Sequence, residues 1–274
     1  MTAPRACAHL DVTLDDDVAV LTLDRPARRN ALTRDMRRAL AARLRHYGDG
    51  RRVRGIVVTG RGDAFSAGLD LREAGRGPVD LPGEMELFND ITRAALAAGV
   101  PVVAALNGVA VGGAGEMALS FDARVAAPGA ALAWPENALG LTVSNAASLF
   151  LPRLAGPSRA RHLVLGSARV DARAALGLGL VDEIVAPDDL VPAAVRLVHR
   201  WTPPGSAAAP HLRLLRPCPD AVERVMAREA EAVRRLEVSG TEAVARTRAG
   251  RAAPAVSPSA APPAPPPCPP PRTR

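Results

Sequence analysis

Three short segments of this chain combine residue types that could polarise a carbonyl group and move a proton beside it. Gly62–Asp70 is a loop of small residues after a predicted strand, where a ligand can approach the backbone itself. Asn107–Glu116 leaves a strand through glycines and enters a helix, whose first amides would stabilise an oxygen that becomes negative. Trp134–Gly140 holds Glu136 in a turn between apolar residues, which favour a raised pKa and proton transfer.

Each of these segments, taken alone, also has a structural explanation. Gly62–Asp70 can be an ordinary loop, and the glycines before Glu116 can serve only the packing of a strand-to-helix turn. A single glutamate beside a proline is usually a solvated loop residue. The functional interpretation therefore depends on the combination of the three segments and on the elements that would bring them together.

The first elements of the chain alternate between strand and helix. Alternating apolar and polar residues over 10–14 and 18–23 predict two strands joined by a tight turn of aspartates. Thr33 can cap a helix with apolar residues at four-residue spacing, which the glycines at 48 and 50 would end. A β-branched strand follows at Gly55–Thr59. This alternation points to a layered α/β arrangement.

The same alternation continues through the middle of the chain, and the later part is mostly helical. We predict a helix from about Glu84 to Ala98 and a strand at Val102–Leu106 after Pro101. Further short strands are predicted at 123–127, 131–134 and 181–185, and helices that start near Ser144, Pro157, Asp171 and Asp188.

The composition fits a globular enzyme. The 274 residues are 48% hydrophobic, which is enough for a large core. The formal charge of +7 arises from 35 arginines with no lysine, and these arginines are dispersed along the chain. A nucleic-acid surface needs clustered charge and aromatic side chains for base stacking, but aromatics make up only 3%. We therefore expect no nucleic-acid partner.

The cysteines and the apolar segments bear on metal binding and location. Cys7, Cys218 and Cys268 lie far apart and form no CxxC pair, so we predict neither a zinc site nor a disulfide framework. The first ten residues hold no apolar run like that of a secretory signal, and no stretch supplies the roughly 20 apolar residues of a membrane span. A soluble protein of the reducing cytoplasm, without membrane association, is the expectation.

Four motifs follow one another in a recognisable order. They are Leu23–Pro26 with Asn30–Leu32, then Ala64–Leu71, then Gly112–Glu116, then Pro135–Glu136 with Leu139–Gly140. In this order and spacing they resemble the enoyl-CoA hydratase/isomerase, or crotonase, family. Weaker similarity extends to about residue 185, and 239–244 is loosely similar to part of the family's C-terminal helix.

The resemblance implies a fold and a domain organisation. The fold would be α/β, a crotonase-like spiral of ββα units with a helical C-terminal region. The spiral core would span 1–190, and a helical region at 191–252 would support a homotrimer or a dimer of trimers. The last segment, 253–274, holds 10 of the 26 prolines and is predicted to be a disordered tail.

The resemblance also implies a site for an acyl-CoA thioester. The amides of Leu69 and Gly113 would form an oxyanion hole for the thioester carbonyl. Glu116 would hold and activate a water molecule, and Glu136 would exchange a proton at the α-carbon. The presence of both glutamates favours hydration of the 2,3 double bond, because isomerases of the family often keep only one. No cofactor is implied, since coenzyme A is part of the substrate.

Contacts to the remainder of the substrate follow from the same resemblance. Ala67 and Leu71 would lie along the CoA moiety, and Arg25 and Arg28 would contact its phosphates. Where hydratases commonly have a Gly-rich run, this chain has 141–148, so Ser144 or Asn145 is predicted to touch an unusual acyl group.

Two alternatives to hydration remain open at this stage. One is isomerisation of the double bond, or another enolate reaction such as decarboxylation, with Glu136 as the sole proton shuttle. The other is a non-catalytic acyl-CoA binding subunit, against which the presence of two glutamates argues, because a binder needs no pair of carboxyl groups beside an oxyanion hole.

Overall fold

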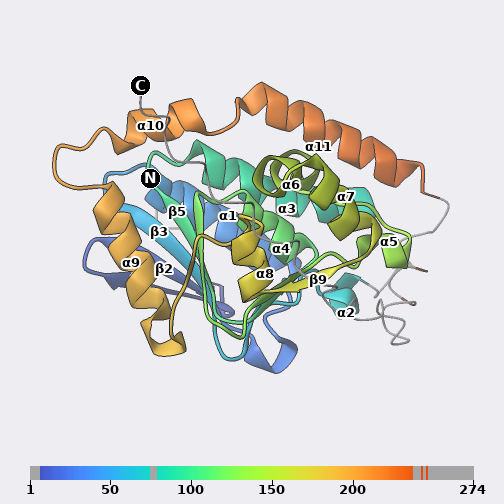
Figure 1. Cartoon of the computed structure of the whole chain (residues 1–274), viewed down its shortest axis with the longest axis horizontal. Coiled ribbons are helices and arrows are strands. Elements are labelled where there is room, and N and C mark those ends of the chain that lie inside the picture. Colours follow the sequence, from blue (N-terminus) through green and yellow to red (C-terminus); the bar gives the residue numbers. More distant parts are fainter. Residues whose placement is uncertain (1–6, 75–78, 237–241, 243–244, 246–274) are drawn as a thin grey trace, which may run out of the picture.

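The computed structural model describes residues 7–74 and 79–236, together with residues 242 and 245. The predicted tail, 253–274, and most of the 239–244 motif lie outside the described residues. Strands and helices alternate as expected and form two sheets with helices packed around them (Figure 1). Within the described ranges, no helix is long and apolar enough to cross a membrane.

The larger sheet has six strands in the order β1-β2-β3-β5-β7-β10. β1 and β2 form the predicted antiparallel hairpin, with Leu10 opposite Leu23. From β2 onward all neighbouring strands are parallel, so each new strand follows a crossover connection. The strands are β1 (Leu10–Asp15), β2 (Val18–Leu23), β3 (Gly55–Gly60), β5 (Val102–Leu106), β7 (Ala123–Ala126) and β10 (Glu183–Ile184).

The smaller sheet has four strands in the order β4-β6-β8-β9. In the successive pairs β3-β4, β5-β6 and β7-β8, the first strand enters the larger sheet and the second enters the smaller one, which winds the chain into the expected spiral. β4, β6 and β8 are parallel, so their carboxyl ends share one edge. These strands are β4 (Ala64–Ser66), β6 (Val109–Val111), β8 (Ala131–Ala133) and β9 (Arg169–Asp171).

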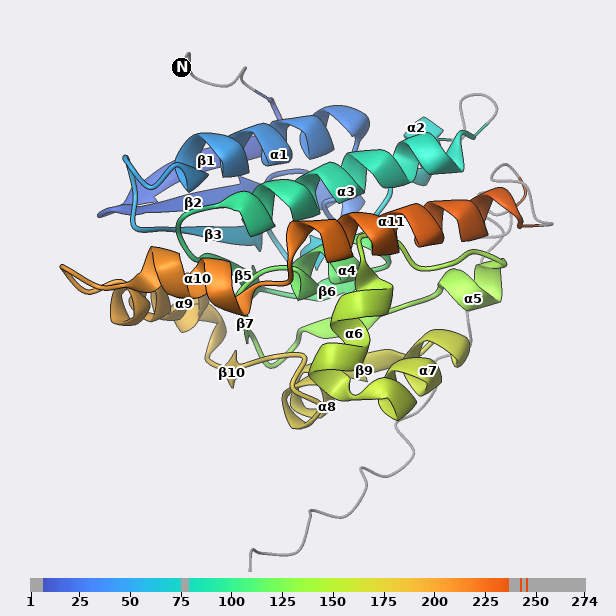
Figure 2. The same ribbon diagram turned by 90° about the horizontal axis from the view of Figure 1, so that it is seen from above.

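Two long helices, α1 (Arg34–Gly48) and α3 (Leu81–Ala97), lie side by side over one face of the larger sheet (Figure 2). The predicted cap of α1 is confirmed, because the Thr33 hydroxyl accepts a hydrogen bond from the Met36 amide at 3.2 Å. α3 begins three residues earlier than predicted. The reason is Asp80, whose carboxylate accepts the Gly83 amide at 3.1 Å and caps the helix there.

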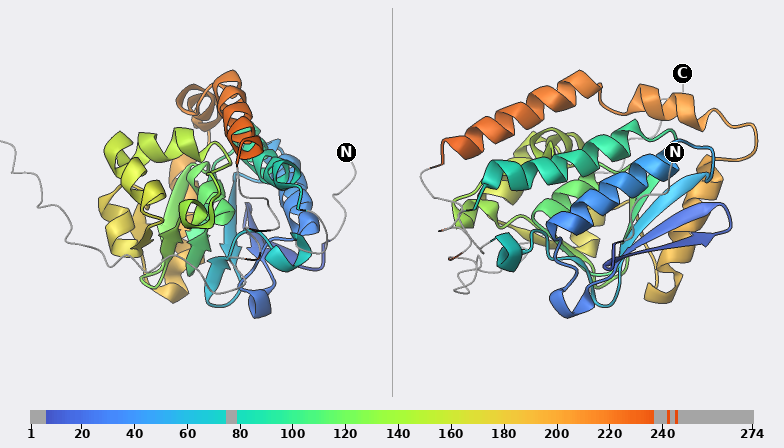
Figure 3. Two further views of the ribbon diagram at one scale, coloured as in Figure 1. Left: turned by 90° about the vertical axis from the view of Figure 1, so that its right-hand side faces the viewer. Right: turned by 180° about the vertical axis from the view of Figure 1, so that it is seen from behind.

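The other face of the larger sheet is covered by α9 (Leu190–Trp201), whose Ala194 and Val198 are fully buried against Val57 and Val103. The predicted C-terminal region thus begins with a helix that belongs to the layered core. The chain then returns across the molecule through α10 (Ala208–Leu215) and α11 (Pro219–Arg234), and α11 packs along α3 (Figure 3). The shorter helices are α2 (Leu71–Ala74), α4 (Gly113–Leu119), α5 (Glu136–Leu139), α6 (Ala147–Ala155), α7 (Pro157–Leu165) and α8 (Ala172–Gly177).

Candidate active site

Glu116 lies in the first turn of α4, directly after β6. The chain leaves β6 through Gly112, whose φ of 54° and ψ of −129° are accessible mainly to glycine, and α4 begins at Gly113. Glu116 is 1% exposed. Its Oε1 accepts the Ser144 amide at 3.1 Å and its Oε2 accepts the Ser144 hydroxyl at 2.6 Å. The carboxylate is therefore fixed by two donors from one residue.

Glu136 opens α5, directly after β8. Because β8 runs parallel to β6, the two glutamates emerge from the same edge of the smaller sheet. A Cβ at Gly112 would lie 2.7 Å from Oε1 of Glu136, so this carboxyl group occupies the space that a side chain at 112 would need. Oε2 of Glu136 is buried and has no hydrogen-bond partner in the described part of the chain.

Both glutamates have raised pKa values. Burial raises the pKa of Glu116 well above its ordinary value, and the charge of Glu136 raises it further, whereas the bonds from Ser144 oppose the shift. Burial raises the pKa of Glu136 to about 7. No cationic side chain contributes to either pKa among the described residues. Glu136 can therefore exchange a proton near neutral pH, and Glu116 is harder to ionise than an exposed glutamate.

The turn after β4 supplies a backbone amide close to α4. Gly68 has a φ of 81°, and a Cβ there would lie 3.8 Å from the amide nitrogen of Gly113. In the bridge that follows, the Leu32 amide donates to Gly68 O at 2.7 Å and the Asp70 amide donates to Leu32 O at 3.1 Å. The amide of Leu69, between them, therefore faces away from Leu32. The first amides of a helix have no intrahelical acceptor, so the amide of Gly113 also has no acceptor within α4.

Ser144 and Asn145 bond to the elements that carry the candidate catalytic groups. Ser144 holds Glu116, as described above. Asn145 is fully buried, and its Nδ2 donates to the carbonyl of Gly113 at 3.2 Å while its Oδ1 accepts the Thr92 hydroxyl at 3.2 Å. Contact of either residue with an acyl group stays a prediction.

The residues expected to contact coenzyme A lie beside the Leu69 turn. The guanidinium of Arg25 pairs with the carboxylate of Asp70. Arg28 is exposed in a short 3-10 helix. Ala67 and Leu71 are half-buried on either side of the turn. Their contacts with coenzyme A stay predictions.

One buried acid next to the site, Glu229, was not predicted from the sequence. Glu229, on α11, is 5% exposed and accepts the Ala146 amide at 2.9 Å, the Ser148 amide at 3.0 Å and the Ser148 hydroxyl at 2.6 Å. A signal was present in the sequence, because Glu229 continues the apolar stripe formed by Val222 and Met226 at helical spacing. An acid within such a stripe marks a buried polar contact.

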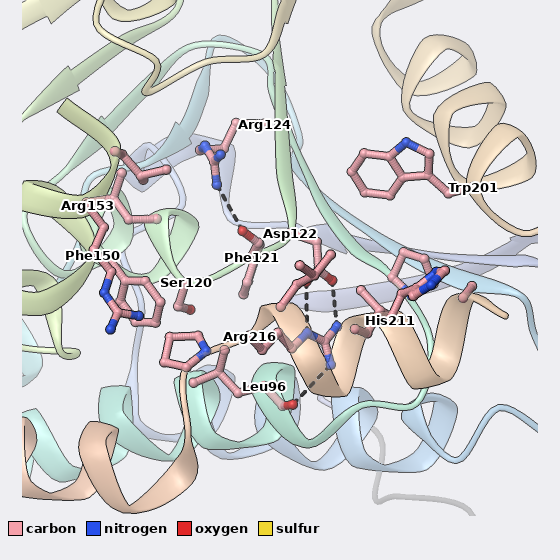
Figure 4. A pocket seen from close by; sticks show the side chains of 17 residues that line it. Leu96, Ser120, Phe121, Asp122, Arg124, Phe150, Arg153, Trp201, His211 and Arg216 are labelled. Atoms are coloured by element: carbon pink, nitrogen blue, oxygen red, sulfur yellow. Dashed lines mark hydrogen bonds and ion pairs between the residues drawn. The ribbon is translucent and has the colours of Figure 1, made fainter.

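A pocket of about 520 Å³ lies away from the glutamates, at the C-terminal end of α4. Phe121 and Trp201 line it, together with Arg216, which forms a bidentate pair with Asp122 at 2.8 and 2.6 Å (Figure 4). Neither of the two glutamates lines this pocket. We therefore place the candidate site at the two glutamates, because of their buried carboxyl groups, and not at this pocket. Among the described residues, no cluster of ligands suits a metal ion.

Comparison with known sequences agrees with this arrangement. The family model for enoyl-CoA hydratase/isomerase matches residues 13–243. The putative enoyl-CoA hydratase/isomerase YngF of Bacillus subtilis is 37% identical over 185 residues, which cover 67% of this chain and 71% of that protein. The crotonyl-CoA hydratase of Syntrophomonas wolfei is 32% identical over 196 residues, which cover 71% of this chain and 75% of that protein.

Solved structures share the fold. An enoyl-CoA hydratase from Mycobacterium avium subsp. paratuberculosis gives a TM-score of 0.79 at 25% identity, covering 92% of this chain and 100% of that one. An enoyl-CoA hydratase/isomerase from Pseudoalteromonas atlantica gives 0.78 at 30% identity, covering 89% and 98%. The expected crotonase fold is confirmed, and the chain is an enzyme that belongs to the enoyl-CoA hydratase/isomerase family.

Proposed function

We propose that this enzyme hydrates a 2-enoyl-CoA, adding water across the 2,3 double bond of the thioester. The observation that carries the proposal is a pair of buried carboxyl groups next to the turn that begins α4, for which the described residues supply no cationic partner. A buried acid with no compensating charge destabilises a fold, so its presence needs a reason, and proton transfer beside a polarised carbonyl supplies one.

The thioester oxygen would be held by the amides of Leu69 and Gly113. The glycine turns at 68 and 112 support this placement, because they bring the two backbone segments within contact distance and leave no side chain between them. The negative charge that develops on the oxygen as the enolate forms would be stabilised by both amides, and loss of one such donor raises a barrier by about 3 kcal/mol.

The two glutamates would divide the proton transfers between them. Glu116, which Ser144 holds in place through two bonds, would in its ionised form take a proton from water as the hydroxyl adds to the β-carbon. Glu136, with a pKa of about 7 and an unbonded Oε2, would give a proton to the α-carbon. Water is thereby added in full, with its hydroxyl at one carbon and a proton at the other.

A panel of acyl-CoA substrates with mass detection of the products tests this proposal. We expect crotonyl-CoA, or a longer or aromatic 2-enoyl-CoA, to gain the mass of one water molecule. Turnover of a 3-enoyl-CoA to its 2-enoyl isomer, with no water gained by any 2-enoyl-CoA, would contradict hydration.

Isomerisation is the second candidate, and one observation favours it. Ser144 holds Glu116 in place, whereas Oε2 of Glu136 has no partner among the described residues and is the freer proton carrier. Under isomerisation Glu136 would move a proton between two carbons, and Glu116 would be dispensable. Replacement of Glu116 by glutamine separates the two reactions, because it removes hydration and spares isomerisation.

We also propose a cytoplasmic homotrimer or dimer of trimers. Leu214 and Leu215 on α10 are 78% and 83% exposed, and Leu215 lines the pocket described above, which supports a self-association surface on the C-terminal helices. Cys7 and Cys218 are free thiols, as suits a reducing compartment. Light scattering during size-exclusion chromatography, and fractionation of the native cells, test the two statements.

A further inference from the structure

Glu229 connects the C-terminal helix α11 to the segment that holds Glu116. α11 runs along α3 and meets α6 (Figures 2 and 3). The N-cap residue of α6 is Ala146, which has no polar side chain to bond the free amides of the first turn. Glu229 accepts two of these amides from a position 81 residues beyond Ser148. The carboxylate thus replaces the missing cap.

The backbone of this segment needs such a contact. Asn145 and Ala146 have φ values of 60° and 57°, a left-handed conformation that asparagine tolerates but that is unfavourable for alanine. Two consecutive residues keep it only when surrounding contacts fix them. Asn145 is fixed by its bond to the carbonyl of Gly113, and Ala146 by the carboxylate of Glu229.

We propose that Glu229 is a positioning residue for Glu116. By fixing Ala146 and Ser148, it places Ser144 so that both the amide and the hydroxyl of Ser144 reach the Glu116 carboxylate. Without Glu229, the strained segment relaxes and the donors of Ser144 no longer fix the Glu116 carboxylate, so activation of water slows, although the lost Glu229 charge would by itself lower the pKa of Glu116. Insofar as it concerns turnover, this inference rests on the proposed hydration.

A purely structural role for Glu229 would be to hold α11 in place, and the chain offers a matched control for that role. Arg93 on α3 pairs with Glu223 on α11 at 2.6 and 2.9 Å, without touching the segment 144–148. Arg93→Gln removes this contact between α3 and α11 and keeps the bonds of Glu229 to Ala146 and Ser148. Glu229→Gln keeps the shape of the side chain but turns one of its two acceptors into a donor that faces a donor amide.

The first experiment is a double-mutant cycle on kcat for hydration. We expect Glu229→Gln and Ser144→Ala each to lower kcat about tenfold, and the double variant to lose about tenfold rather than a hundredfold, because both act on one interaction. KM should change less than threefold, and Arg93→Gln should keep the wild-type kcat. Multiplicative losses in the double variant, or an unchanged kcat in Glu229→Gln, would overturn the proposal.

The second experiment needs no substrate. Hydrogen exchange of the Ser144 amide in the ligand-free protein should become at least about tenfold faster in Glu229→Gln and stay at the wild-type rate in Arg93→Gln. Equal exchange in wild type and Glu229→Gln would refute the positioning role even if hydration is found. If no enoyl-CoA is hydrated but exchange responds as expected, the proposed function fails and the positioning of Ser144 by Glu229 is supported.

Discussion

Two buried acidic sites, Asp70 and the pair Glu116 and Glu136, lie close to the same turn, but their surroundings shift their pKa values in opposite directions. Asp70, directly after Leu69, pairs with Arg25 and accepts two backbone amides at 2.8 and 3.1 Å. Burial would raise the pKa of Asp70, but these partners outweigh it and the pKa is lowered. Glu116 and Glu136 have no cationic partner within the described residues, and both pKa values are raised.

The difference separates a structural acid from a chemical one. At Asp70 the loss of hydration is offset by an ion pair and by the start of α2, so its charge holds the Leu69 turn in position. At the glutamate pair the loss is only partly offset, by two bonds from Ser144 to one of the two groups. A carboxyl group that is hard to ionise in place is suited to exchanging protons.

The largest effect should come from removing the proton exchange. Glu116→Gln and Glu136→Gln keep the shape of each side chain but cannot exchange a proton, so each should lower kcat for hydration about 10³-fold. Urea unfolding at neutral pH should show no loss of stability, because the amide carries no charge to bury. Steady-state kinetics and equilibrium unfolding measure the two quantities.

The matched control for these variants is Glu231→Gln, at a glutamate that pairs with Arg234 and Arg235 on the surface of α11. It should keep the wild-type kcat. If a variant of Glu116 or Glu136 unfolded at lower urea but kept the wild-type kcat, the glutamate pair would stabilise the fold and would not act in the reaction.

The next effect is a dependence of stability on pH with opposite signs at the two sites. The pKa of Glu136 is about 7 in the folded protein and 4.5 ordinarily, so its contribution is fully present below 4.5 and is lost as pH rises through 7. Relative to Glu136→Gln, the wild type should lose about 3 kcal/mol of unfolding free energy over this range.

For Asp70 the sign is reversed, because its folded pKa lies below 3.8, and its contribution is lost as pH falls through the folded pKa. Urea midpoints of wild type, Glu136→Gln and Asp70→Asn measured at several pH values test both signs. A wild-type curve parallel to that of Glu136→Gln would mean that Glu136 is not protonated at neutral pH.

A smaller effect on stability should follow from breaking the ion pair between Asp70 and Arg25. Asp70→Asn keeps the size of the side chain and an acceptor oxygen for the amides of α2, but leaves the half-buried Arg25 without its counter-ion. We expect a loss of about 2 kcal/mol of unfolding free energy at neutral pH. The kcat of Asp70→Asn should fall only modestly, because the turn that carries the Leu69 amide is disturbed but no proton carrier is removed. A loss of kcat as large as that of the glutamate variants would mean that Asp70 acts in the reaction.

Much of this comparison was available from the sequence. Local rules gave the hairpin around the aspartates, the Thr33 cap of α1 and the strand at Val102–Leu106, because each depends on neighbours in the chain. The motifs that contain Glu116 and Glu136 predicted that these two side chains are the candidate catalytic groups. Parallel strands with a common edge then explain why segments so far apart in the sequence meet.

The partners of these groups could not be predicted, because they depend on contacts between distant segments. Nothing in the local sequence reveals that Arg25, for which a phosphate contact is predicted, pairs with Asp70, 45 residues later. The bonds from Ser144 to Glu116 could not be predicted either, because the two residues are 28 positions apart. The left-handed backbone at Asn145 is equally invisible, because only tertiary contacts force it.

The smallest effect should come from an ion pair at the surface. It compares the buried acids with a charged pair that remains in contact with water. Arg93 and Glu223 form two short bonds, as good in geometry as any buried pair, but their side chains are 31% and 49% exposed. Water and salt screen their attraction, so Glu223→Gln should reduce the unfolding free energy by only about 0.5 kcal/mol. Urea unfolding at low and high salt checks this value, and the difference from wild type should shrink as salt is added. An effect as large as that of Asp70→Asn would show that good geometry, and not burial, decides what a charge contributes in this protein.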